Sequence, residues 1–428
     1  MMAWGRVRAL LAALVSPDYR KLWLSIAVAN SGRWAMVLAV GWLLQTLTGS
    51  SLWVGASLFA MQGPALVFAP LAGVLADRLP RTKILALALA TASLASAVLA
   101  ILAARHLAGR FEVVGLALML GVAASFQSTT WAALLPNVVD RDALLNATAL
   151  QGAARQGAEF LGPALAAPIL ALVGPWAVFA LCALLYGTAA LVPLGIRRGV
   201  HGDRKLGPGI LAPLRQGVAY VRQTEPLGAL VVIVGLHCCL TMDFMALLPG
   251  FLQSRLHAGS DVYGATMTAI GLGAILGCLP LTAVRSLHLR RRLYLITALC
   301  SGVSLIAFGL MRSETSALVA AVTVGGSQAA FMAITGTAVQ ERCADDFRGR
   351  LSSVYTLLTM GSMALFTWAY GALGVVVDPG LIMAAAGAAF VIAVIVALTI
   401  SPIVRGLCAL GAGAAGAPLV ALAEGEAM

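Results

Sequence analysis

Charged side chains are scarce in this sequence. Only 11% of its 428 residues are Asp, Glu, Lys or Arg, whereas 61% are hydrophobic and the mean hydropathy is +0.94. A soluble protein of this composition would expose apolar patches large enough to drive aggregation. The shortage of charge therefore excludes an ordinary soluble domain and predicts a protein embedded in a membrane.

Disulfides and enzyme signatures are lacking as well. The seven cysteines lie almost entirely within apolar runs, so the sequence indicates no disulfide framework. It contains no Walker lysine motif, no zinc-protease motif and no paired aspartates of a membrane prenyltransferase. The glycine-rich segment 271–277 lies inside an apolar run with no strand before it, which argues against a nucleotide loop. We expect no enzyme activity, no cofactor and no metal site.

What the sequence does contain is a series of long apolar runs. A helix needs roughly 20 apolar residues to cross the hydrocarbon core. Twelve runs are of about this length: 22–46, 52–76, 83–104, 112–135, 150–173, 175–196, 227–252, 262–284, 292–311, 316–340, 351–376 and 380–402. The runs are continuous and do not alternate, which excludes the strands of a membrane barrel. The sequence predicts an all-α polytopic membrane protein with twelve transmembrane helices.

The distribution of positive charge predicts the orientation of these helices. With the N-terminus inside, the external segments hold only Arg105, Arg110, Arg255 and Arg312, and nearly all the other Lys and Arg residues lie in cytoplasmic segments. This asymmetry predicts a multi-pass protein of the cell (inner) membrane with both termini in the cytoplasm. The net charge of +11 is then a topology signal, and we expect no nucleic-acid partner.

A long basic segment divides the runs into two sets of six. We expect a cytoplasmic interfacial segment at 1–21, a six-helix bundle at 22–196, a cytoplasmic linker at 197–226, a second six-helix bundle at 227–402 and a cytoplasmic tail at 403–428. The middle of the linker, 211–221, is apolar enough to form a short amphipathic helix on the membrane surface.

The segment 73–83, GVLADRLPRTK, joins the second and third runs. Gly73, Asp77, Arg78 and Arg81 match the loop motif of major facilitator transporters, whereas Pro80 and Thr82 depart from it. The resemblance implies the major facilitator fold, with two pseudo-symmetric six-helix bundles. It also implies that Asp77 caps the eleventh helix near Arg348, Gly349 and Arg350 and latches the bundles in the outward-facing state. The alternative is a plain basic loop on the cytoplasmic side.

The corresponding segment after the eighth run is a degraded copy of this motif. Gly277 is present, but Leu281 stands where the acid would be. Only the cations Arg285 and Arg290–Arg292 persist there. We therefore expect the first copy to be the stronger of the two latches.

A second resemblance lies in the fifth run. Gly162 and Pro163 match a pattern that exporters of the family carry, associated with drug/proton antiport, with alanine in place of glycine at 158, 166 and 167. Small residues allow close helix packing and proline bends a helix. Segments 16–23, 47–50, 134–150 and 348–350 add cues that resemble the enterobactin-exporter-like branch, also called transmembrane secretion effectors. Arg33 departs from that branch, which often has an acid there.

Ionisable groups within the spans are the candidate functional residues, because hydrocarbon disfavours unpartnered charge. Glu159 and Asp243 are the candidates for proton coupling. Arg155 shares a helix face with Glu159, and the pair could equally be structural; Asp243 could simply end its span. Arg33 could bind an anionic substrate group or neutralise an acid of another helix. The substrate-cavity candidates are Asn30, Arg33, Gln62, Gln127, Trp131 and Arg155.

These residues and the resemblance together predict a secondary active transporter. We expect proton-coupled efflux of a small molecule, such as a siderophore, a drug or a secondary metabolite, by a monomer that works by alternating access. Uptake or lysophospholipid-type translocation is an alternative within the same fold. A non-transporting receptor or a polytopic enzyme is the alternative from another class. The sequence does not identify the substrate.

Overall fold

The computed structural model describes residues 12–196, 211–284, 286–343 and 347–400, and every regular element in these ranges is a helix. The tail 403–428, the N-terminal residues 1–11 and the linker residues 197–210 lie outside the described residues. Local sequence explains where several helices begin and end. The first long helix, for example, has Ser16 as its N-cap, and the Ser16 side chain accepts a hydrogen bond from Tyr19 N. The helix ends at the C-cap Gly49, whose φ of 63° lies in the left-handed region.

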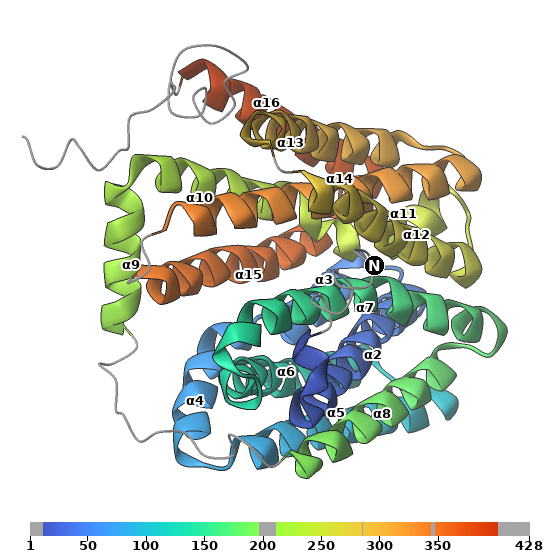
Figure 1. The fold of residues 1–428 in the computed structure, drawn as a ribbon. Helices are drawn as coiled ribbons and strands as arrows, with labels where there is room; N and C mark the ends of the chain where they lie inside the picture. The colour runs from blue at the N-terminus through green and yellow to red at the C-terminus, as the bar shows by residue number, and fades with distance from the viewer. Residues whose placement is uncertain (1–11, 197–210, 285, 344–346, 401–428) are drawn as a thin grey trace, which may run out of the picture.

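Residues 12–195 form the first group of helices (Figure 1). Its long elements are α2 (Pro17–Thr48), α3 (Ser51–Gln62), α4 (Ala65–Arg78), α5 (Arg81–Ala104), α6 (Arg110–Val138), α7 (Leu144–Leu172) and α8 (Pro175–Leu191). Short 3₁₀ turns occupy Ala12–Val15, Arg141–Ala143 and Val192–Gly195. The predicted second span is interrupted at Gly63 and Pro64, between α3 and α4, because proline removes a helix hydrogen bond.

Residues 211–400 form the second group, drawn from light green to red in Figure 1. Its elements are α9 (Leu211–Gln223), α10 (Glu225–His237), the π-helix η4 (Cys238–Met242), the 3₁₀ helices η5 (Asp243–Ala246) and η6 (Leu279–Ala283), α11 (Leu248–Arg255), α12 (Ser260–Cys278), α13 (Leu287–Leu310), α14 (Glu314–Glu341), α15 (Arg348–Leu373) and α16 (Pro379–Ile400). The predicted seventh span is therefore broken into four pieces.

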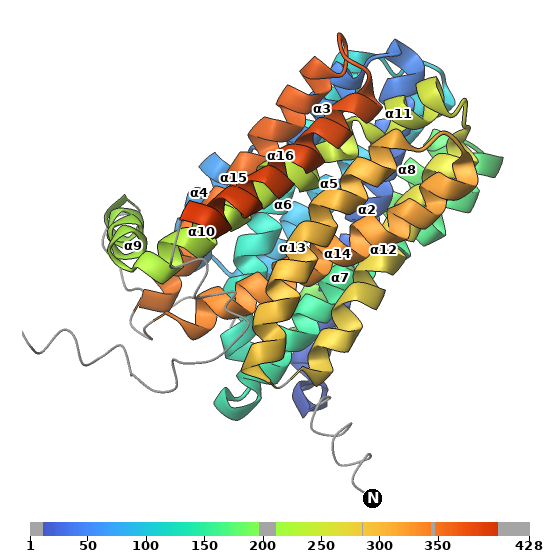
Figure 2. The same ribbon diagram turned by 90° about the horizontal axis from the view of Figure 1, so that it is seen from above.

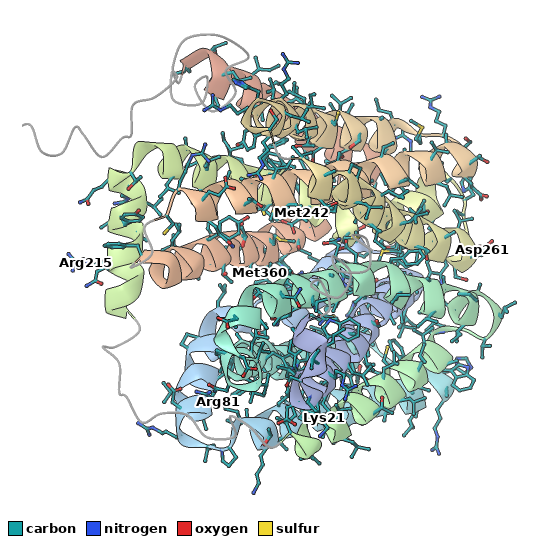
Figure 3. The ribbon with its side chains drawn as sticks, viewed as in Figure 1. Lys21, Arg81, Arg215, Met242, Asp261 and Met360 are labelled. Carbon is teal, nitrogen blue, oxygen red and sulfur yellow. The ribbon has the colours of Figure 1, made fainter. Side chains whose placement is uncertain are left out.

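Ten segments of the described chain are long and apolar enough to cross a membrane. They coincide with ten of the twelve predicted runs. Helices α7 and α15 fill the positions of the fifth and eleventh runs but fall outside these ten, so the predicted count of twelve is not confirmed. α9 lies across the long helices at their edge, with its Arg215 directed outward in Figure 3. It packs through Tyr220, whose ring stacks on Phe347 at 4.3 Å.

Two ends of the bundle are distinguished by charge. The basic end carries Arg78, Arg81, Arg290–Arg292 and Arg342, and the opposite end carries the loops at 49–50, 105–109, 256–259 and 374–378. One continuous hydrophobic core joins the first group to the part of the second group near the opposite end, including Phe244, Phe251 and Phe308. The basic part of the second group has a separate core around Tyr294, Phe331 and Val339. The two groups are thus fused at the opposite end.

Candidate functional site

Helices α3 and α15 join the two groups by direct backbone contact. A Cβ atom added at Gly55 would lie 2.8 Å from the carbonyl oxygen of Thr367, and one added at Gly371 would lie 2.6 Å from that of Ser51. Neither site has room for a side chain, so glycine is what permits this approach.

Helices α7 and α12 form the second junction between the groups. A Cβ atom at Gly271 would lie 2.7 Å from the carbonyl oxygen of Glu159, and one at Gly264 would lie 3.0 Å from Ala167 Cα. We call these two glycine-lined junctions, α3–α15 and α7–α12, the seams. Around them Tyr263 stacks on Trp42 at 5.5 Å, and Gln45 Nε2 donates to Gln253 Oε1 at 3.3 Å.

The glycines nearer the basic end have different surroundings. A Cβ atom at Gly152 or Gly157 of α7, or at Gly336 of α14, would meet nothing within 4 Å. Gly73 on α4 would meet only the Thr129 methyl, at 4.0 Å. These positions have space that the seams lack. The described contacts between the two groups are thus tight at the seams, and Figure 2 shows the long helices of both groups running from the opposite end toward the basic end.

Asp243 lies directly behind the α3–α15 seam. Its side chain is buried, and Oδ1 accepts a hydrogen bond of 2.8 Å from Thr367 Oγ1, while Oδ2 is buried with no hydrogen-bond partner. Thr367 is the residue whose carbonyl oxygen faces Gly55. One residue of α15 therefore connects this carboxyl group to the junction between the groups. The sequence placed Asp243 near the end of a span and gave no sign of Thr367 as its partner.

The break in the seventh span explains how a carboxyl group becomes buried here. The π-helix frees backbone carbonyls, and side chains from other helices satisfy them: Gln328 Nε2 donates to Thr241 O at 2.5 Å, and Tyr370 Oη donates to Leu240 O at 3.2 Å. One turn earlier, His237 Nε2 lies 2.9 Å from Ser301 Oγ. Sequence reasoning missed this polar network, because its members come from four separate helices.

Glu159 occupies the corresponding position beside the α7–α12 seam. Its carboxylate accepts a hydrogen bond of 2.9 Å from Gln156 Nε2. The charges of Arg155 and Arg33 act on this carboxylate, although neither is within ion-pair distance in the described structure. Both roles that the sequence left open for Arg33 on α2, binding an anionic substrate group and neutralising an acid of another helix, stay predictions.

The other cavity candidates make contacts of ordinary helix packing. Asn30 Nδ2 donates to Ile26 O in its own helix at 2.8 Å, and Gln127 Nε2 donates to Ala88 O at 3.5 Å. Trp131 is buried with no partner for Nε1, and Gln62 ends α3. Their assignment to a substrate cavity stays a prediction. Across the described residues, no group of three or more His, Cys, Asp and Glu side chains could hold a metal ion.

The latch residues are paired within the first group. Arg81 is buried and donates to Ala76 O at 3.1 Å and Ala133 O at 2.9 Å, and its Nη2 lies 3.6 Å from Asp77 Oδ1 (Figure 3). The Asp77 side chain is 55% exposed. The side chains of Arg348, Gly349 and Arg350 at the start of α15 lie outside the described residues. A cap by Asp77 on α15 therefore stays a prediction, and it belongs to a state in which the basic end is closed.

Gly162 of the helix-packing motif in α7 lies in close contact with α2. A Cβ atom at Gly162 would lie 2.6 Å from both Ser31 O and Trp34 Cβ, so α7 and α2 touch at this point. Pro163 and Pro168 lie inside α7. The small residue at 162 is thus needed for packing within the first group, and its link to antiport stays a prediction.

These features define the class of protein. Apolar spanning helices in two groups, joined at one end by glycine seams beside the buried Asp243, define a polytopic membrane protein with the major facilitator fold. Solved structures support the fold: a POT family transporter in complex with 5-aminolevulinic acid aligns with a TM-score of 0.71 at 11% identity, covering 90% of this chain and 96% of that one. The nucleoside transporter NupG aligns with a TM-score of 0.67 at 11% identity, covering 92% and 99%.

The chain belongs to the transmembrane secretion effector family, whose model matches residues 9–406. It is similar to macrolide efflux protein A of Streptococcus pyogenes, at 25% identity over 78% of this chain and 83% of the relative. It is also similar to the enterobactin exporter EntS of Shigella boydii, at 26% identity over 85% and 86%. A third relative is the staphyloferrin A transporter of Staphylococcus aureus, at 22% identity over 64% and 69%. The chain is accordingly a transporter and not an enzyme.

Proposed function

We propose that this transporter exports a small molecule from the basic end to the opposite end by alternating access, driven by proton exchange. The observation that carries the proposal is the position of two acids, the buried Asp243 and the partly buried Glu159. Asp243 and Glu159 belong to different groups of helices, and each lies beside one of the two seams. The names of the relatives, which refer to efflux and export, support the direction of transport.

The proposed topology adds two transmembrane helices to the ten described spans. In it α7 and α15, which carry the polar residues of the seams, are the fifth and eleventh of twelve transmembrane helices in two six-helix bundles, 22–196 and 227–402. The basic end faces the cytoplasm of the inner membrane with both termini, by the positive-inside rule. The described structure then corresponds to a state that is open toward the cytoplasm.

In this proposal a proton on Asp243 removes the free-energy cost of a buried negative charge. With one hydrogen bond and an unpartnered buried oxygen, the carboxylate form of Asp243 would cost several kcal/mol. The seam at Gly55 and Gly371 therefore closes when Asp243 carries a proton. Loss of the proton favours separation of α3 from α15, because water can then reach the charge. At Glu159 the charges of Arg33 and Arg155 offset part of the same cost.

The test is efflux from cells loaded with a panel of compounds that includes macrolides, siderophores and lysophospholipids, with and without a protonophore. The double variant Glu159→Gln/Asp243→Asn should be inserted and folded but should lose gradient-driven efflux. Glu112→Gln, which alters an exposed acid at the opposite end, is the matched control. Undiminished proton-driven efflux by the double variant would overturn the coupling role. Net uptake, or movement of lysophospholipid alone, would replace the exporter assignment.

A further inference from the structure

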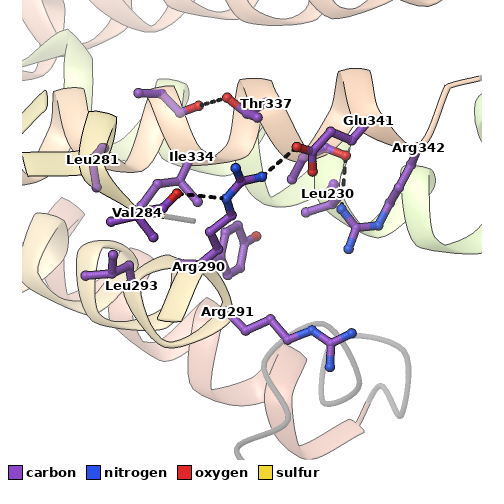
Figure 4. A pocket seen from close by; sticks show the side chains of 13 residues that line it. Leu230, Leu281, Val284, Arg290, Arg291, Leu293, Ile334, Thr337, Glu341 and Arg342 are labelled. Atoms are coloured by element: carbon purple, nitrogen blue, oxygen red, sulfur yellow. Dashed lines mark hydrogen bonds and ion pairs between the residues drawn. The ribbon is translucent and has the colours of Figure 1, made fainter. Parts of the chain in front are cut away.

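A cavity of about 160 Å³ lies at the basic end of the second group (Figure 4). It is lined from α10, η6, α13 and α14, and no residue of the first group takes part. Drug-sized ligands occupy pockets of about 300–1,000 Å³, whereas one water in the liquid takes about 30 Å³. This cavity is too small for the exported compounds considered above. It has room for a small anion with a short substituent.

The charge of the lining is unbalanced. Arg290, Arg291 and Arg342 contribute three positive charges, and Glu341 is the one acid among the described lining residues. Arg290 Nη1 contacts Glu341 Oε1 at 2.6 Å, and Arg342 Nη1 donates to Ala338 O at 3.0 Å. Arg291 Nε is buried with no hydrogen-bond partner. Among the described residues, Arg291 and Arg342 therefore have no acid within ion-pair distance.

Burial lowers the pKa of Arg342; the charge of Glu341 opposes this effect, and the like charge of Arg291 adds to it. An anion placed between Arg291 and Arg342 would relieve their repulsion. Guanidinium groups bind phosphate oxygens with paired, charge-assisted hydrogen bonds, which makes phosphate the chemical group that suits them.

The degraded loop motif contributes to the lining of this cavity. In the first group, Arg81 belongs to the motif, and its donors are used by two carbonyls and the acid Asp77. In the second group, Leu281 stands at the position of that acid, and Leu281 lines the cavity. The negative charge that the motif would supply is missing from this place.

We propose that this cavity binds a phosphate group, as a monoester or diester, which supplies the negative charge missing at Leu281. Apolar lining residues such as Leu230, Leu293 and Ile334 would contact the organic part of the ligand. Such a group can come from an anionic lipid headgroup of the leaflet at the basic end, or from a soluble phosphate compound. Both sources present the same chemistry to Arg291 and Arg342.

Two probes separate the sources. Full-length protein in detergent is titrated with inorganic phosphate at constant ionic strength, and the melting temperature is recorded. In parallel, the protein is placed in nanodiscs of phosphatidylglycerol or phosphatidylcholine, and retained lipid is measured by native mass spectrometry. Arg291→Ala/Arg342→Ala should weaken binding of the effective probe by about tenfold or more. Arg292→Ala removes a neighbouring exposed charge that does not line the cavity, and it should bind like the unmodified protein.

A second variant keeps all the arginines and tests whether the excess positive charge of the cavity causes phosphate to bind. Leu281→Asp restores the acid within the cavity, so it should abolish the phosphate response while the protein stays as stable as before. A response confined to phosphatidylglycerol identifies a lipid site, and a response to inorganic phosphate identifies a soluble ligand. The proposal is overturned if neither probe binds, or if the double arginine variant and Leu281→Asp respond like Arg292→Ala. None of these readouts depends on transport.

Discussion

At the scale of single residues, burial separates side chains that look equivalent in the sequence. Arg78 and Arg81 lie three positions apart in one basic loop, yet Arg78 is exposed and Arg81 is buried with three partners. Thr359 and Thr367 of α15 are both buried, but only the Thr367 hydroxyl reaches a carboxyl group. Each pair provides a variant and its own control.

The first prediction concerns Arg81. Arg81→Lys should lower the free energy of unfolding by about 1–3 kcal/mol, because a single ammonium nitrogen cannot take the three positions from which Nε, Nη1 and Nη2 contact Ala76 O, Ala133 O and Asp77. Arg78→Lys should change it by less than about 0.5 kcal/mol, as for most exposed positions. Thermal or denaturant unfolding in detergent measures both. Equal effects of the two substitutions would show that the buried contacts of Arg81 do not stabilise the loop.

The second prediction concerns the partner of Asp243. Thr367→Val keeps the side-chain shape but removes the one hydrogen bond to this carboxyl group, so transport should fall by about tenfold and its pH profile should change. Thr359→Val loses only a hydrogen bond within its own helix and should keep the original profile. The measurement is the initial rate of efflux over a range of pH. An unchanged profile in Thr367→Val would separate Asp243 from proton coupling.

At the scale of elements, the sequence predicts most of the helices well and fails where tertiary contacts replace helical hydrogen bonds. Ten predicted runs coincide with spanning helices of the described chain, because continuous apolar stretches leave the backbone no other way to satisfy its polar groups in lipid. The π-helix at Cys238–Met242 was not predicted. Its freed carbonyls are satisfied by Gln328 and Tyr370, which lie about 90 and 130 residues further along the chain.

The third prediction concerns the seams. Gly371→Ala should weaken closure of the opposite end, because the added methyl group meets the backbone of α3. We expect a shift of about 1–3 kcal/mol toward the state with this end open, measured as increased labelling of a cysteine placed at Ser51 after the native cysteines are replaced. Gly152→Ala, which meets nothing within 4 Å, is the control and should not alter labelling. Equal labelling in both variants would contradict the role of the seam.

At the scale of the whole molecule, the two groups of helices share a core at one end only. A two-state transporter needs one closed end and one end that can close, and the spare space at Gly73, Gly152 and Gly336 is consistent with the second requirement. In the described state Asp77 contacts Arg81 of its own group. Its predicted contact with α15 would form only when the basic ends approach each other.

The fourth prediction follows from this difference between states. Asp77→Asn should deplete the state in which the basic end is closed by about 0.3–2 kcal/mol, since the neutral side chain lacks the attraction of a carboxylate to the helix dipole. Spin labels at Leu79 and Gln340, in a background without the native cysteines, should report fewer short distances. Labels at Leu107 and Arg312, near the opposite end, should report fewer long ones. An unchanged distribution at both pairs would exclude the latch.

The sequence by itself determined that this protein is a helical membrane protein, because membrane insertion depends on apolar run length and on the placement of positive charge, which are local properties. The transporter class followed from the resemblance of segment 73–83 to the major facilitator loop motif. The sequence also identified Glu159 and Asp243, since a charge inside a span stands out against its neighbours. Only the tertiary structure decided what these acids face. The link from Asp243 through Thr367 to Gly55, and the excess of arginine around Leu281, depend on contacts between helices far apart in the chain. No local pattern in the sequence encodes those contacts.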